Sequence, residues 1–250
     1  MYKKQKIVVV MPAYNAARTI VKTYYEVMAT GIVDLVIVVD DNSTDATAKI
    51  AADLPQVKLI RHLRNLGYGA NQKTCYRRAL QAGADIVIMI HPDYQYTPKL
   101  IPAIVAMIAS GEYHCVLASR ILGGRAMAGG MPWWKYFANR FLTCSENILL
   151  GSKLSEFHSG YRAFSATLLR QLPLQRNSDD FIFDNQILVQ IHNLGYVIAE
   201  ISCPTKYFAE ASSIDFRRSL KYGIGCLLTG VRFRLHHWGF WHSWLFSDEK

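Results

Sequence analysis

The stretch LVIVVDDNSTDATAKIAA (residues 35–52) joins an uninterrupted apolar run to a polar cluster and then to a helical segment. An apolar run without polar alternation is typical of a strand that is buried on both faces of a sheet. Similar runs occur at 7–11, 57–60, 86–90 and 115–118, and helical stretches separate them at 16–30, 68–82 and 98–109. Strands that alternate with helices in this way predict an α/β fold with a parallel sheet.

Each predicted strand ends in a cluster of polar or small residues. In chain order these clusters are PAYNA, DDNSTD, RNLGYG, HPDYQ and SR. In an open α/β sheet the carboxyl ends of the strands form the ligand crevice. The sequence therefore predicts that these loops meet in one site.

Composition narrows the class of protein. At 250 residues, with 51% hydrophobic and 19% charged residues, the chain is long enough for one large globular domain. A net charge of +9 favours an anionic partner. The basic residues form no recognisable nucleic-acid-binding motif, so we expect no nucleic-acid partner. Scattered cysteines without a CxxC pair suggest reduced thiols and a cytoplasmic protein.

The C-terminal part of the chain differs from the rest. It is basic and amphipathic, and it ends in an aromatic cluster with Trp238, Trp241 and Trp244. No stretch has the roughly 18–20 apolar residues that a membrane-spanning helix needs, and the N-terminal run is too short for a signal peptide. We expect a main domain over 1–213 and an extension over 214–250. The extension suits a membrane surface, and a partner protein or a second copy of the chain is the alternative.

Two adjacent carboxylates, Asp40 and Asp41, follow the second predicted strand. Helix capping explains the serine and aspartate after them but not this pair, because neighbouring like charges repel. Hydrogen bonds to a nucleotide base or ribose are the interpretation that we favour. The glycines of RNLGYGAN (64–71) allow close approach of a phosphate but fit an ordinary loop equally well. The stretch lacks the GxGxxG pattern, which disfavours a nicotinamide enzyme.

Six segments occur in the order found in family 2 glycosyltransferases: MPAYNAARTI (11–20), VVDDNSTDAT (38–47), NLGYGAN (65–71), HPDYQY (91–96), SR (119–120) and EFHSGYRAF (156–164). The sequence resembles in particular the dolichyl-phosphate mannose synthase-like subgroup, whose members move a sugar from a nucleotide to a polyprenyl phosphate. The resemblance covers roughly residues 5–210. It implies a GT-A fold, which is a Rossmann-like, mixed and mostly parallel sheet flanked by helices. It also implies an inverting reaction with Mg²⁺ or Mn²⁺.

The resemblance assigns the donor side of the site to residues that follow the predicted strands. The nucleotide-sugar pocket would contain Pro12, Tyr14, Asn15, Asp40, Asp41, Gly67 and His91. Asp93 and Gln95 match the carboxylate and amide of the family's metal-binding DxDxQ stretch. His91 stands where the first aspartate is usual, and a neutral imidazole is still able to ligate a metal or to bind the pyrophosphate. A strand-end histidine with structural contacts alone is the alternative.

An acceptor phosphate is anionic at neutral pH, so it needs positive charge rather than a strong general base. Arg120 matches the family arginine after the fifth strand, and Lys135 stands where relatives usually have arginine. Asn139 lies four residues further along a predicted helix, on the same face as Lys135. We expect these three residues to bind the acceptor phosphate.

Glu156 stands at the position of a family aspartate, near the general base of broader family 2 enzymes. With a phosphate acceptor we expect Glu156 instead to orient Arg162 or the acceptor. A Glu–Arg pair that only fixes the turn is the alternative. The predicted catalytic set is Asp93, Arg120, Lys135, Glu156 and Arg162.

We therefore expect an inverting, metal-dependent transferase that uses a nucleotide-sugar donor and a polyprenyl phosphate acceptor. One alternative keeps the donor but uses a sugar hydroxyl as acceptor, with Glu156 as base. Another is a binding protein that lost turnover through His91. The aromatic residues around Lys135, such as Trp133 and Trp134, fit core packing or a membrane interface. We expect peripheral association with the cytoplasmic membrane face, and a homo-oligomer is possible.

Overall fold

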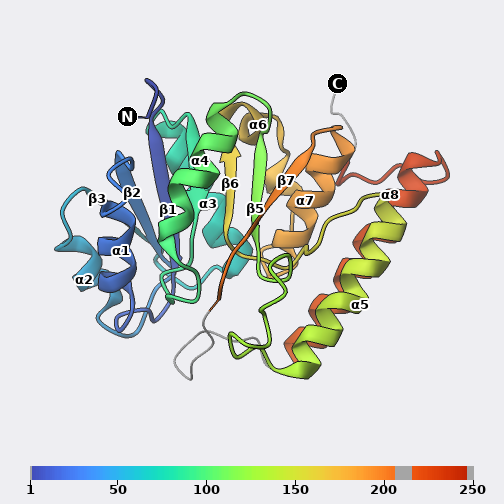
Figure 1. The fold of residues 1–250 in the computed structure, drawn as a ribbon, viewed down its shortest axis with the longest axis horizontal. Helices are drawn as coiled ribbons and strands as arrows, with labels where there is room; N and C mark the ends of the chain where they lie inside the picture. The colour runs from blue at the N-terminus through green and yellow to red at the C-terminus, as the bar shows by residue number, and fades with distance from the viewer. Residues whose placement is uncertain (1, 206–215, 247–250) are drawn as a thin grey trace.

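A computed structural model describes residues 2–205 and 216–246 of the chain. In this part of the chain a seven-stranded sheet has the order β3-β2-β1-β4-β6-β5-β7 (Figure 1). The strands are β1 Ile7–Ala13, β2 Leu35–Asp40, β3 Val57–Arg61, β4 Ile86–Met89, β5 Cys115–Ser119, β6 Arg162–Ser165 and β7 Ile198–Ser202. The helices are α1 Ile20–Met28, α2 Thr47–Ala52, α3 Tyr68–Gln81, η1 Pro98–Leu100, α4 Ile101–Ala109, α5 Trp133–Leu150, α6 Ala166–Gln171, η2 Leu174–Arg176, α7 Phe183–Asn193 and α8 Phe216–His237.

Strands β1 to β4 confirm the parallel arrangement that the apolar runs predicted. Strand β1 lies between β2 and β4, so that Val9 is opposite Val36 on one side and Ile88 on the other. Every residue of β1 is buried. A strand that is covered on both faces has no solvent side, which explains why its sequence lacks polar alternation.

Strand β6 is the main feature that the residue pattern did not predict. It runs antiparallel to both β4 and β5, with Ala163 opposite Ile88 and Val116. The stretch EFHSGYRAF over residues 156–164 has the composition of a polar turn. The four residues of β6 include an arginine and a serine, so they form no apolar run that would indicate a strand. Its insertion makes the sheet mixed and mostly parallel, as the resemblance implied.

Helices cover both faces of the sheet (Figure 1). One apolar core lies between the sheet and helices α1, α2 and α4. A second core lies between the other face and helices α3, α6 and α7, and it also receives Phe233 from α8. The strand ends between these layers are therefore held from both sides, which fixes the loops that follow them.

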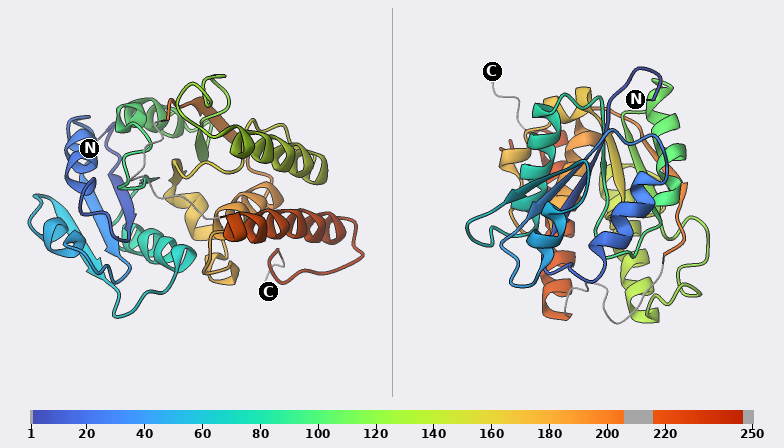
Figure 2. Two further views of the ribbon diagram at one scale, coloured as in Figure 1. Left: turned by 90° about the horizontal axis from the view of Figure 1, so that it is seen from below. Right: turned by 90° about the vertical axis from the view of Figure 1, so that its left-hand side faces the viewer.

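Helices α5 and α8 lie side by side at one end of the molecule (Figure 2). Glycines of α8 permit this close packing, because a Cβ on Gly230 would lie 2.8 Å from Leu149 Cδ1 of α5. The C-terminal extension is thus helical, as predicted, and packs against the main domain. The predicted boundary between residues 213 and 214 falls outside the described residues. Among the residues that the structure describes, no helix has both the length and the apolar character needed to cross a bilayer.

Candidate active site

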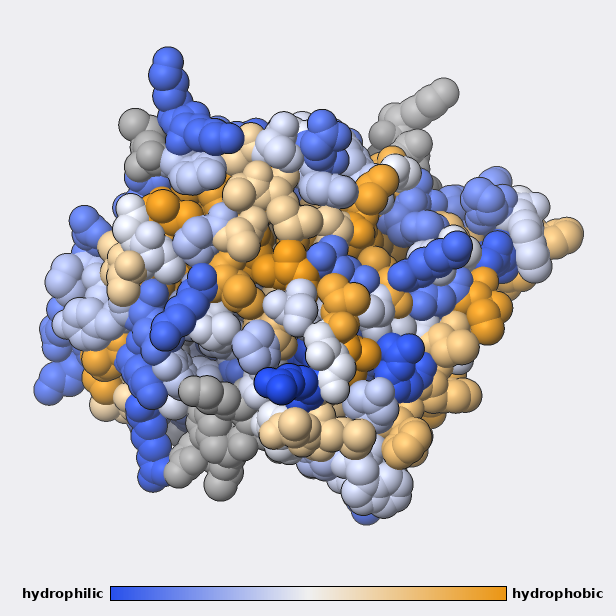
Figure 3. Space-filling view, in the orientation of Figure 1, coloured by the Kyte–Doolittle hydropathy of each residue, from blue (hydrophilic) through white to orange (hydrophobic). Residues whose placement is uncertain are grey.

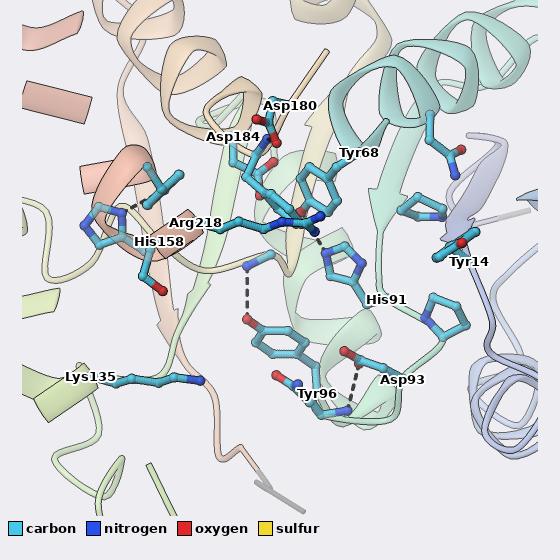
Figure 4. Close-up of a pocket in the computed structure, with 18 of the residues that line it drawn as sticks. Tyr14, Tyr68, His91, Asp93, Tyr96, Lys135, His158, Asp180, Asp184 and Arg218 are labelled. Carbon is cyan, nitrogen blue, oxygen red and sulfur yellow. Dashed lines mark hydrogen bonds between the residues drawn. The ribbon is translucent and has the colours of Figure 1, made fainter. Parts of the chain in front are cut away.

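A cleft of about 1270 Å³ lies at the carboxyl ends of β1, β2 and β4 and extends to α5 and α8 (Figure 4). The loops after the predicted strands meet here, as the sequence indicated. Of the predicted site residues, the cleft is lined by Pro12, Tyr14, Asn15, Asp41, Gly67, His91, Asp93, Gln95, Arg120, Lys135 and Asn139. Three others, Asp40, Glu156 and Arg162, are fully buried and do not line it.

Asp41 organises the wall of the cleft that is next to α3. Its carboxylate accepts hydrogen bonds from the backbone N–H groups of Leu66 (2.9 Å) and Gly67 (3.0 Å), and it contacts His62 Nδ1 at 2.7 Å. Gly67 has φ 98°, and a Cβ there would lie 2.7 Å from the Asp179 carbonyl oxygen. Only glycine fits this position, so the loop holds Asp41 at the cleft.

Asp40 has a different role from its neighbour. Its Oδ2 accepts a hydrogen bond from the Ser43 N–H at 3.2 Å and lies 3.4 Å from Arg61 Nε. The side chain is completely buried. Asp40 therefore does not line the cleft, and its predicted contact with the nucleotide stays a prediction. Residues of adjacent positions in an extended segment point in opposite directions, which separates the two carboxylates.

Tyr14 and Asn15 form the opposite wall. Asn15 adopts the left-handed backbone conformation, with φ 52°, and its Oδ1 accepts a hydrogen bond from the Thr44 N–H at 2.9 Å. This bond ties the loop after β1 to the loop after β2. Tyr14 is 53% exposed, so its ring is available to a ligand at the cleft mouth.

The turn after β4 carries the predicted metal ligands. Asp93 Oδ1 accepts a hydrogen bond from the Gln95 N–H at 3.1 Å, and the carboxylate points into the cleft (Figure 4). The oxygen donors of Asp93 and Gln95 suit Mg²⁺ or Mn²⁺. Within residues 2–205 and 216–246, no group of three or more His, Cys, Asp or Glu side chains is placed to hold a metal ion. A cation at this turn would need further ligands from a substrate.

Glu156 holds Arg120 in place through hydrogen bonds. Arg120 Nε donates to Glu156 Oε1 at 2.7 Å, its backbone N–H donates to Glu156 Oε2 at 2.8 Å, and Nη2 donates to the His158 carbonyl oxygen at 2.8 Å. Asn139 Nδ2 donates to the same Glu156 Oε1 at 2.8 Å. Burial alone would raise the pKa of Glu156, but the charge and hydrogen bonds of Arg120 outweigh it, and the pKa lies below its ordinary value.

We expected Glu156 to orient Arg162 or the acceptor; its ion-pair partner is Arg120 and not Arg162. Arg162 Nε donates to the Ser159 carbonyl oxygen at 2.7 Å, and Nη2 donates to the Phe157 carbonyl oxygen at 3.1 Å. Its Nη1 lies 3.5 Å from Asp184 Oδ1. Arg162 therefore fixes the turn before β6 from inside the protein, and it does not contact a ligand in the cleft.

Lys135 supplies a second cation on the same side of the cleft as Arg120. Burial lowers the pKa of Lys135, and the neighbouring charge of Arg120 lowers it further. Among residues 2–205 and 216–246, Glu156 forms an ion pair with Arg120, and no ion pair of Lys135 is found. This part of the cleft is therefore suited to an anion.

Several residues of the cleft were missed in sequence. They are Tyr68 of α3, Asp184 of α7, and Arg218, Lys221 and Tyr222 of α8. The Arg218 side chain points into the cleft in Figure 4. The spacing of residues 218, 221 and 222 on one helical face was the available signal. From sequence we assigned this basic helix to a membrane surface, a partner protein or a second copy of the chain, because nothing in sequence places it over the sheet.

A buried acid lies behind the cleft. Burial raises the pKa of Glu146 to about 8, although a hydrogen bond from Asn185 acts in the opposite direction. Glu146 Oε2 lies 3.2 Å from His158 Nε2, and burial lowers the pKa of His158 to about 4. His158 Nδ1 is 2.9 Å from the Tyr222 hydroxyl. At neutral pH this pair holds one proton, and it connects α5 and α8 to the cleft wall.

Comparison with known proteins gives relatives that cover most of the chain. A UDP-N-acetylglucosamine–dolichyl-phosphate N-acetylglucosaminyltransferase of Methanococcus voltae is 28% identical over 80% of this chain and 86% of that protein. An undecaprenyl-phosphate mannosyltransferase of Micrococcus luteus is 24% identical over 78% of this chain and 82% of that protein.

A solved structure shares the fold. Glucosyl-3-phosphoglycerate synthase from Mycobacterium tuberculosis, in complex with Mn²⁺, uridine-diphosphate and glucosyl-3-phosphoglycerate, is similar over 91% of this chain and 79% of that one. The TM-score is 0.67 and the identity is 21%. The expected GT-A fold is thereby confirmed. The model of the family described as glycosyl transferase family 2 matches residues 8–172, so this chain belongs to that family and is a glycosyltransferase.

Proposed function

We propose that the protein transfers a sugar, with inversion, from a nucleotide-sugar donor to a polyprenyl phosphate. The observation that carries this proposal is the pair of cations, Arg120 and Lys135, in the same cleft as the Asp93 turn. A transferase with two anionic substrates needs such a pair, because it has to hold one anion beside another. The activities named for the relatives from Methanococcus voltae and Micrococcus luteus support a polyprenyl phosphate acceptor.

On the donor side, we assign the nucleoside to the walls formed by Tyr14, Asn15 and Asp41. Asp93 and Gln95 would hold a divalent cation, Mg²⁺ or Mn²⁺, together with the diphosphate of the donor. The cation would supply positive charge for the departing nucleoside diphosphate. The Mn²⁺ and uridine-diphosphate of the mycobacterial structure support this assignment through the common fold.

On the acceptor side, the phosphate oxygen is itself the nucleophile. Arg120 and Lys135 bind it and align it with the anomeric carbon. Glu156 is completely buried and is hydrogen-bonded to Arg120 and Asn139, which leaves it poorly placed to remove a proton from a hydroxyl. This burial favours the phosphate acceptor over a sugar-hydroxyl acceptor.

We further propose that the protein rests on an anionic membrane surface. An outer apolar face, in which every side chain is between 42% and 71% exposed, consists of Trp133, Phe137, Phe141, Ile148, Leu220, Ile224, Leu228 and Val231. Their spacing places them along one side of α5 and one side of α8, and apolar side chains follow the outer edge of α5 in Figure 3. Exposed aromatic and aliphatic residues on basic helices suit the headgroup boundary.

The test is transfer from a panel of nucleotide sugars to a short-chain polyprenyl phosphate, with Mg²⁺ or Mn²⁺. We expect a sugar-phospho-lipid and a nucleoside diphosphate as products. The matching polyprenol, which lacks the phosphate, is the control and should not react. Transfer to the polyprenol or to a simple sugar, with no reaction of the phosphate, would refute the proposed acceptor.

A further inference from the structure

His91 is the last member of a hydrogen-bonded series that begins inside the protein. The Tyr68 hydroxyl donates to Asp184 Oδ2 at 2.6 Å, and the same hydroxyl oxygen lies 3.0 Å from His91 Nε2. Gln72 Nε2 donates to the other oxygen of Asp184 at 2.8 Å. A hydroxyl has one hydrogen, and Tyr68 gives it to the carboxylate. His91 Nε2 is therefore the donor to Tyr68 and carries the ring proton.

Tyr68 is well suited to keep this arrangement. Burial and the charge of Asp184 raise its pKa well above the ordinary value, so the phenol stays protonated. Its ring stacks on Phe181 at 4.7 Å and on the His91 ring at 5.5 Å, measured between ring centroids. These contacts hold the hydroxyl between the carboxylate and the imidazole.

Gly160 determines which edge of the imidazole faces the cleft. A Cβ on Gly160 would lie 2.6 Å from His91 Nε2 and 2.7 Å from His91 Cδ2. That edge of the ring is packed against the backbone of Gly160. The opposite edge, which contains Nδ1, is turned away from Gly160, and His91 lines the cleft.

We infer that Asp184 and Tyr68 are positioning residues that fix the His91 ring with its proton on Nε2, so that the lone pair of Nδ1 is presented to the divalent cation of the donor complex. Histidines that ligate metals usually donate their second N–H to a carboxylate or carbonyl, and here the tyrosine hydroxyl transmits that bond. Only the claim that His91 binds the divalent cation of the donor complex rests on the proposed function. The ring tautomer follows from the hydrogen bonds alone.

His91 would also affect the metal selectivity of the site. It adds a nitrogen donor to the oxygen donors of Asp93 and Gln95. Imidazole suits transition-metal ions, whereas carboxylates suit Mg²⁺. The site should therefore prefer Mn²⁺ to Mg²⁺, and His91→Asp should move this preference toward Mg²⁺.

The tautomer is tested without any metal. Long-range ¹H–¹⁵N correlation spectra of the labelled protein, recorded at alkaline pH, distinguish a protonated Nε2 from a protonated Nδ1. The His91→Gln spectrum identifies the signal. We expect protonated Nε2 in the wild type and a loss of this fixed state in Tyr68→Phe. Tyr76→Phe is the matched control, because it removes a buried hydroxyl bond to Gln72 Oε1 (2.8 Å) on the same helix. A protonated Nδ1 in the wild type would overturn the inference.

The ligand is tested by Mn²⁺ and Mg²⁺ titrations in the presence of a nucleoside diphosphate. Loss of an outer partner of a metal-binding histidine typically weakens metal affinity by about 10–100-fold, and Tyr68→Phe should weaken Mn²⁺ by about tenfold. Tyr76→Phe should not. Unchanged Mn²⁺ affinity in both Tyr68→Phe and His91→Gln would show that His91 does not bind the cation. Failure of the proposed function would have another signature, which is no binding of any nucleoside diphosphate to the wild type.

Discussion

Glu156 lies directly beneath Arg120, with Oε1 2.7 Å from the arginine Nε, and the carboxylate has no exposed surface. The pair places one neutralised cation at the cleft, and Lys135 lies near it without an ion pair to any of the described residues. The arrangement suggests that Glu156 acts on the acceptor through Arg120.

Glu156→Gln tests this relationship. The variant keeps the shape of the side chain but loses the charge that holds Arg120, so we expect a higher KM for the polyprenyl phosphate and an unchanged KM for the donor. Steady-state kinetics with each substrate varied in turn measure both constants. Glu200→Gln is the control, because Glu200 accepts a hydrogen bond from the Ser155 hydroxyl at 2.6 Å on the same turn. Abolished kcat with an unchanged acceptor KM would point to a general base and a hydroxyl acceptor.

Lys135→Met should weaken acceptor binding. A hydrogen bond to a charged group contributes about 1.5–3 kcal/mol, which corresponds to a rise of about 10–100-fold in the acceptor KM. Lys135→Arg should retain binding, since relatives usually have arginine there. Lys153→Met removes an exposed charge beyond the end of α5 and is the control. Equal KM values in Lys135→Met and Lys153→Met would contradict the assignment.

Arg218 and Arg217 form a natural pair of test and control. Both are exposed near the start of α8, but only Arg218 lines the cleft. The pKa of Asp180 is lowered mainly by a hydrogen bond from Lys221, and the charge of Arg218 lowers it further. Arg218→Gln should weaken binding of a nucleoside diphosphate more than binding of the monophosphate, whereas Arg217→Gln should affect neither. Calorimetry with both nucleotides measures this, and identical behaviour of the two variants would exclude Arg218 from the anion site.

The raised pKa of Glu146 leads us to expect that the stability of the protein depends on pH. Burial raises its pKa from 4.5 to about 8, so the folded state keeps a proton that the unfolded state releases. Its contribution to stability is complete below 4.5 and is lost as pH rises toward 8. His158, with a pKa lowered to about 4, has the opposite slope between about 4 and 6.5. The net fall should lie between about 6.5 and 8.

Thermal unfolding at a series of pH values measures this fall. Glu146→Gln removes the titrating group and should flatten the curve above pH 6.5. Asn185→Ser leaves the carboxyl group in place, although it removes one hydrogen-bond partner, and should retain the slope. A wild-type curve that is already flat between 6.5 and 8 would show that Glu146 is ionised in the folded state.

The outer apolar face predicts binding to vesicles of anionic phospholipid. Ile224→Glu together with Leu228→Glu should reduce binding in a flotation assay by about tenfold or more, because charges are costly in the lipid boundary. Val197→Glu is the control, since Val197 is 65% exposed and lies outside this face. Equal vesicle binding by all variants, or loss of a dimer in place of vesicle binding, would assign the face to another partner.

The fold and the meeting of the strand-end loops in one cleft followed from sequence because both obey local rules. Apolar runs such as Ile7–Ala13 give buried strands, and Asp41 and Asp93 lie at strand ends that a parallel sheet brings together. The antiparallel strand β6 escaped these rules. Its sequence RAFS contains an arginine and a serine and so forms no apolar run, and its pairing partners are distant in the chain.

The polar residues within motifs were harder to assign. Arg162 and Asp40 have the same chemistry as residues that contact ligands, and only burial distinguishes them. Tyr68, Asp184 and Arg218 reach the cleft from three different helices. Their convergence depends on how α3, α7 and α8 pack over the sheet, and no short sequence window contains that information.

Helix α8 carries Arg218 and Tyr222 on one side and Leu220 and Ile224 on another. Helix α8 packs closely against α5 at Gly230, so the two helices would sit on a bilayer together. A bilayer that binds this helix pair would therefore set the height at which the reactive phosphate enters the cleft. Lipid thickness and headgroup charge would then tune catalysis through geometry, with no additional regulatory element.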